Sequence, residues 1–82
     1  MNISEALRNV LKDSKTSQTQ LAERIGAKTP SVVAQRLRMT NLSVDTILEM
    51  LDAMNYELVI QEKKRGRRPE GQMLIDRGGE AE

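Results

Sequence analysis

The chain of 82 residues contains neither cysteine nor histidine. The absence of thiols excludes disulfides and thiolate metal sites, which fits a reducing cytoplasm. The absence of imidazoles excludes zinc fingers, histidine general bases and Ser-His-Asp triads. No nucleophile–base pair or carboxylate cluster is visible either, so we expect no enzyme, no metal site and no cofactor.

Aromatic residues and long apolar runs are also scarce, and Tyr56 is the only aromatic residue. No apolar run approaches the length of a membrane span, and the N-terminus lacks the layout of a signal peptide. We therefore expect a cytoplasmic protein without a membrane partner. A core of this size is marginal alone, so a dimer that buries more apolar surface is expected.

The net charge of +1 conceals three segments of different charge. Residues 1–62 hold seven basic and eight acidic side chains, residues 63–68 hold five basic ones, and residues 69–82 hold one arginine and four acids. Such segregation indicates a nearly neutral domain, a basic segment and an acidic end. Residues 63–82 have little apolar content and are expected to form a flexible tail.

The most informative stretch, residues 17–38, predicts two short helices joined by a tight turn. Apolar residues within 18–25 recur with the i, i+3, i+4 spacing of one helical face. Ser17 is placed to cap this helix, and Gly26 to end it in a left-handed conformation. Thr29 is predicted to cap the second helix, with Pro30 at its first position, where a missing N–H is tolerated.

The second helix has one apolar seam, Val33 and Leu37, and an outer face free of acid. Amides and hydroxyls can contact base edges, small apolar groups can contact thymine methyls, and arginine suits guanine or phosphate. A helix that enters a DNA major groove needs such a surface. The outward residues are Ser31, Gln35 and Arg38, with Val32 and Ala34 on the flanks.

The pattern S-Q-x-x-L-A-x-x-I-G from Ser17, with V-x-x-R-L from Val33, resembles the lambda-repressor and Cro-like (XRE-type) helix-turn-helix family. From Gly26 to Val33 the chain is one residue longer than the family's commonest spacing. The resemblance implies a mainly all-α domain of four to five helices over residues 1–55. It also implies a sequence-specific regulator of double-stranded DNA.

The family resemblance implies that Gln18 contacts a phosphate and the recognition helix, and that the loop over residues 39–42 grips phosphate. Simple turn chemistry explains Thr40 and Asn41 equally well. The predicted DNA-binding residues are Gln18, Lys28, Thr29, Ser31, Val32, Gln35, Arg36, Arg38, Thr40 and Asn41. The alternative is a four-helix domain whose helical hairpin meets a protein partner.

Two amphipathic helices are predicted to flank this motif. Residues 1–14 carry an apolar stripe, and either Asn2 or Ser4 can cap its start. Residues 43–55 carry a wider stripe, with Ser43 as the cap and Asn55 as a left-handed end. The stripe of the last helix, wide enough for a core wall and part of an interface, comprises Val44, Ile47, Leu48, Leu51 and Met54.

Residues 56–62, YELVIQE, change to the alternating period of a β-strand. Nothing else in the chain is suited to pair with this strand, and unpaired backbone groups are costly when buried. We therefore predict antiparallel pairing with a second copy about a two-fold axis, as in antitoxin-like regulators of the resembled family. The predicted dimerisation residues are Tyr56, Leu58, Val59 and Ile60.

The tail has two parts with open interpretations. The basic part can contact DNA phosphates, enter a minor groove as Arg-Gly-Arg hook peptides do, or serve as a solvated linker. Its candidate residues are Lys63, Lys64, Arg65, Arg67 and Arg68. The acidic part, with the apolar triplet 73–75, is either disordered, a short strand or a docking element for a protein partner.

The sequence thus predicts a dimeric repressor that binds an inverted-repeat operator through the helix over residues 29–38. The alternative function is a protein-interaction module, such as an antitoxin or a phage-encoded inhibitor. In that case the C-terminal tail would bind a toxin or another protein.

Overall fold

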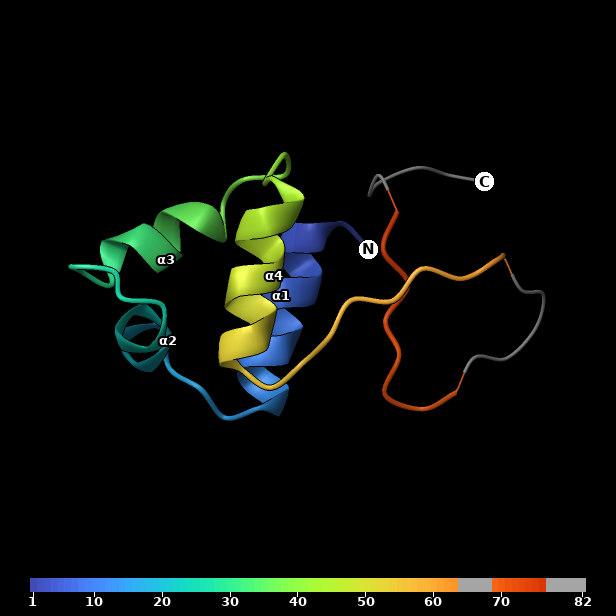
Figure 1. The fold of residues 1–82 in the computed structure, drawn as a ribbon, viewed down its shortest axis with the longest axis horizontal. Coiled ribbons are helices and arrows are strands. Elements are labelled where there is room, and N and C mark those ends of the chain that lie inside the picture. The colour runs from blue at the N-terminus through green and yellow to red at the C-terminus, as the bar shows by residue number, and fades with distance from the viewer. Residues whose placement is uncertain (64–68, 77–82) are drawn as a thin grey trace.

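The computed structural model describes residues 1–63 and 69–76, and this part of the chain forms four α-helices (Figure 1). In chain order they are α1 (Ile3–Asp13), α2 (Gln18–Arg24), α3 (Ser31–Arg36) and α4 (Val44–Ala53). α2 and α3 lie at one end of the molecule, α1 and α4 form its middle, and the extended segments 57–63 and 69–76 lie at the other end (Figure 1). The mainly helical class is as predicted.

Three of the helices begin with a side-chain cap at a position that the sequence indicates. In α1 and α2 the cap is a reciprocal box, because the residue three positions later also accepts a hydrogen bond from the N–H of the cap. α4 has a single cap bond. The pairs are Asn2–Glu5 and Ser17–Gln20, with bonds of 2.9–3.0 Å, and Ser43–Thr46, with a bond of 3.2 Å.

The predicted start of α3 is wrong in detail. Pro30, and not Thr29, occupies the cap position, and α3 has no side-chain cap hydrogen bond. Pro30 already has helical dihedral angles (φ −64°, ψ −19°), so the helical backbone begins there. The Thr29 hydroxyl instead lies 2.7 Å from the Ser31 hydroxyl. The turn between α2 and α3 is therefore closed by backbone geometry and not by a threonine cap.

Three helices end on a residue with a left-handed backbone. These residues are Lys15 (φ 55°), Gly26 (φ 76°) and Asn55 (φ 64°), of which the sequence analysis predicted the last two. In each case the N–H of the following residue donates to a carbonyl five residues back, as in a Schellman motif. The bonds are Thr16–Leu11 (3.0 Å), Ala27–Ala22 (2.8 Å) and Tyr56–Leu51 (2.9 Å).

The core takes one of its largest fully buried side chains from each helix. These are Leu7 of α1, Leu21 of α2, Val33 of α3 and Met50 of α4. The apolar stripe predicted on the last helix divides into two parts. Ile47, Leu51 and Met54 are buried, whereas Val44 is 59% exposed and Leu48 is 41% exposed. Burial of a leucine-sized side chain contributes about 1.5–3 kcal/mol. The four fully buried side chains, one from each helix, therefore determine how the helices pack.

The strand predicted over residues 56–62 is not present as a strand. The described residues contain no β-strand, and among them no backbone hydrogen bond joins 57–63 to another segment. The alternating pattern gives an extended segment, but a strand needs a partner to complete its hydrogen bonds. Antiparallel pairing of this segment with a second copy stays a prediction.

Candidate nucleic-acid interface

α3 presents two distinct faces. Val33 is fully buried and Leu37, just after the helix, is 3% exposed, as the apolar seam predicts. Ser31 and Gln35 lie on the exposed face, and Arg38 follows on the same exposed surface. Val32 and Ala34 are half-buried on the flanks. The polar face predicted for base contacts is therefore open to solvent, and the apolar seam anchors the helix.

The end of α3 is held by side chains of α1. The Leu37 carbonyl accepts hydrogen bonds from the Ser4 hydroxyl and from the Arg8 guanidinium, the latter at 2.8 Å. Ser4 is 4% exposed, so this hydroxyl serves the interior of the domain. Two donors on one carbonyl fix the position of α3 relative to α1, because moving the helix would leave a buried acceptor unsatisfied.

This role of the first helix was not predicted from the sequence, which shows there an apolar stripe and a cap. Ser4 and Arg8 are four residues apart and so lie on the same side of α1. That spacing, next to the apolar stripe, was the available signal. It gave no indication of the acceptor, because Leu37 lies 29 residues after Arg8.

A second polar contact joins α2 to α4. The Arg24 guanidinium, in the last turn of α2, donates to the Ala53 carbonyl at the end of α4 (3.2 Å). This contact satisfies one of the carbonyls that a helix end leaves without an intrahelical partner. It places positive charge at the negative end of the α4 dipole, where it is favourable. Side-chain hydrogen bonds thus join α2 to α4, and α1 to the end of α3.

Arg36 differs from the other predicted DNA contacts because it is ion-paired within the chain. Its guanidinium lies 2.9 Å from the Glu49 carboxylate of α4, and its side chain is 25% exposed. The other predicted residues outside α3 are exposed on and around α2 and α3. They are Gln18, Lys28, Thr29, Thr40 and Asn41. Gln18 forms no hydrogen bond with α3 among the described side chains.

The candidate residues of the basic segment are not gathered with this surface. Lys63 is exposed, and segment 57–63 leads away from α2 and α3 toward the opposite end of the molecule (Figure 1). Lys64, Arg65, Arg67 and Arg68 lie outside the described residues. The three interpretations of this segment therefore stay predictions.

Two short helices joined by a glycine turn, with the second anchored by one face and open on the other, define a helix-turn-helix DNA-binding domain. A family model described as Helix-turn-helix matches residues 7–61. The chain belongs to this helix-turn-helix family, the lambda-repressor and Cro-like DNA-binding regulators. Searches of curated proteins and of solved structures found no match. Within the described ranges, no helix is long and apolar enough to cross a membrane.

Proposed function

We propose that this protein is a dimeric transcriptional repressor that binds an inverted-repeat operator with α3 in the major groove. The observation that carries the proposal is the exposure of Ser31 and Gln35 on a helix whose opposite side is fixed in the core. Amide and hydroxyl groups on a rigid helix can form directional hydrogen bonds with base edges. Lys28 and Arg38, both exposed, supply positive charge for phosphates at either end of α3.

Dimerisation follows from the geometry that such recognition needs. One helix of six residues reaches few base pairs, so a single copy would bind weakly. Two copies related by a two-fold axis place their recognition helices in successive major grooves, about 34 Å apart. Binding of the first half-site then raises the effective concentration of the second helix at the other half-site. Repression would result from occupation of the promoter.

The test is selection of DNA sequences from a random pool by the purified full chain, followed by footprinting on the recovered site. We expect an inverted repeat with half-sites one helical turn apart. The double variant Ser31→Ala/Gln35→Ala should lose specific binding by roughly 1,000-fold or more, since a dimer loses four base contacts at about 1–3 kcal/mol each. Both side chains are exposed, so the variant should keep the wild-type melting temperature.

A control is Glu70→Ala, which removes an exposed polar side chain at the other end of the molecule. It should retain the selected site with unchanged affinity. If Ser31→Ala/Gln35→Ala binds the selected site as tightly as wild type, α3 is not the recognition helix and the proposal fails.

The protein-interaction alternative predicts a different response to the same kind of experiment. An antitoxin or inhibitor that captures a protein with its C-terminal tail would keep that partner after Ser31→Ala/Gln35→Ala. It would lose the partner after truncation behind Glu62. Recovery of a protein partner by the tail, with no DNA sequence selected, would favour the alternative.

A further inference from the structure

The described C-terminal residues 71–76, here called the clasp, fold back onto the N-terminal end of the domain. The Asp76 N–H donates to the Met1 carbonyl at 2.9 Å. The Met1 ammonium lies 3.2 Å from the Asp76 carboxylate and 3.5 Å from the Leu74 carbonyl. Met73 is half-buried and packs against the core cluster. An extended segment of this chain is therefore bound to the surface of its own helical domain.

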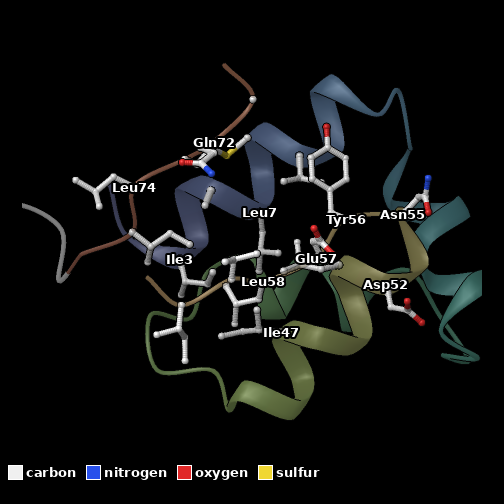
Figure 2. Close-up of a pocket in the computed structure, with 18 of the residues that line it drawn as sticks. Ile3, Leu7, Ile47, Asp52, Asn55, Tyr56, Glu57, Leu58, Gln72 and Leu74 are labelled. Atoms are coloured by element: carbon white, nitrogen blue, oxygen red, sulfur yellow. The ribbon is translucent and has the colours of Figure 1, made fainter. Parts of the chain in front are cut away.

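The clasp lines one side of a groove with a volume of about 860 Å³. The other residues that line it come from α1, α4 and residues 55–61. Figure 2 shows Leu58 between Leu7 of α1 and Ile47 of α4, with Ile3 and Leu74 nearby. Most side chains around the groove are apolar, so water in it is easily displaced by an apolar guest.

Segment 57–61 has the properties of a surface that a second chain would cover. Ile60 is 95% exposed and Val59 is 62% exposed. No backbone hydrogen bond joins this segment to the rest of the described chain. A partner that adds a strand would satisfy these backbone groups and cover these side chains together.

The distribution of charge favours one of two places in which such a partner can lie against segment 57–61. The segment borders the apolar groove, and its first two residues also border a second hollow beside α4. Four carboxylates line that hollow, and they belong to Asp45, Glu49, Asp52 and Glu57. In a two-fold dimer the same surface meets itself, so pairing there would bring like charges together. Asp52 and Glu57 also line the groove, whereas Asp45 and Glu49 do not, so pairing in the groove brings fewer like charges together.

We propose that the groove is the docking surface for residues 57–61 of a second copy, which would take the place of the clasp that forms one of its walls in the single chain. The proposal rests on the dimeric function proposed above and specifies its interface. The clasp is suited to displacement because its ion pair is exposed to solvent, with side chains 32% and 51% accessible, and such pairs are weak. Release of the clasp and dimerisation are then coupled steps.

The test is sedimentation equilibrium of the full chain with the clasp weakened by point substitutions. Asp76→Lys places like charges together at the Met1 ammonium, and Met73→Ser removes the side chain that packs on the core. Both should lower the apparent dissociation constant of the dimer. If the clasp is closed in about nine molecules of ten, full release lowers that constant about 100-fold, because both copies of a two-fold dimer must open. Glu70→Lys, an exposed position just before the clasp, makes the same charge change as Asp76→Lys and should have no effect.

Each outcome separates this inference from the proposed function. A wild-type dimer whose dissociation constant is unchanged or raised by Asp76→Lys and Met73→Ser overturns the clasp as a competitor, and leaves the dimeric regulator standing. A chain that stays monomeric at all concentrations, with and without these substitutions, overturns both. Tighter dimers in both clasp variants but not in Glu70→Lys support the inference.

Discussion

Single residues set the ends of the helices, and Lys15 does so in an unfavourable backbone conformation. Lys15, Gly26 and Asn55 all have positive φ and all terminate a helix by the same backbone hydrogen bonds. Glycine adopts this conformation readily and asparagine tolerates it, whereas a lysine side chain crowds the backbone. The strain at Lys15 persists because the bond from the Thr16 N–H to the Leu11 carbonyl depends on the turn.

Lys15→Gly should stabilise the domain by about 0.5–1 kcal/mol, which is the strain relieved less the greater chain entropy of glycine in the unfolded state. The measurement is thermal unfolding by circular dichroism, where we expect a melting temperature a few degrees higher. Lys12→Gly is the matched control, because Lys12 lies in the last turn of α1. It should destabilise by roughly 0.5–1 kcal/mol. Equal effects of the two substitutions would show that the strain is absent.

At the scale of elements, α3 is a short helix whose position is decided by its neighbours. Six residues are too few for a stable isolated helix, so tertiary contacts must hold it. Val33 and Leu37 supply apolar burial, and α1 binds the Leu37 carbonyl through Ser4 and Arg8. The ion pair from Arg36 to Glu49 adds a link to α4. This last link also engages a positive charge that would otherwise be available on the surface proposed to face DNA.

Glu49→Gln should raise DNA affinity by a few-fold and steepen the salt dependence, with a slope larger by up to about one for one further phosphate contact. The reason is that the Arg36 guanidinium becomes free to bind phosphate. Loss of a partly exposed pair should lower the free energy of unfolding by less than about 1 kcal/mol. The measurement is a binding titration on the selected operator at several salt concentrations.

Asp52→Asn provides the comparison for Glu49→Gln, since it removes the same charge from an exposed residue of α4 and leaves the Arg36–Glu49 ion pair intact. It should change affinity much less. If both substitutions raise affinity equally, the effect comes from net charge and Arg36 has no specific role in DNA binding.

At the scale of the whole molecule, the two functions proposed for the chain lie at opposite ends. α2 and α3 form one end, and segments 57–63 and 69–76 form the other (Figure 1). The helical domain, which includes α2 and α3, buries a core of thirteen apolar residues. Such a small core gives limited stability, so association through the far end would stabilise the fold by mass action.

The melting temperature of the full chain should therefore rise with protein concentration, because a folded dimer unfolds to two chains. Leu58→Lys should abolish this dependence and give a monomer in sedimentation experiments. Leu58 is already 39% exposed, so a lysine there should leave the single domain folded. An unchanged dimer in Leu58→Lys would rule out segment 56–62 as the dimer contact.

Much of the helical fold was predictable because its signals are local. The caps at Ser17 and Ser43 and the left-handed ends at Gly26 and Asn55 depend on residues within one turn. The start of α3 was mispredicted because either Thr29 or Pro30 can occupy the cap position. The backbone of the turn places Pro30 there. Residues 56–62 are extended but unpaired in the single chain, because alternation specifies an extended backbone and the hydrogen-bond partner predicted for it is a second copy.

The sequence by itself determined the four helices, their buried faces and the polar outer side of α3, since helical periodicity and capping act between near neighbours. Only the tertiary structure decided that Ser4 and Arg8 hold the Leu37 carbonyl, that Arg36 pairs with Glu49, and that the clasp returns to Met1. Those contacts join residues far apart in the chain. Their partners are chosen by how the helices pack, which no local pattern records.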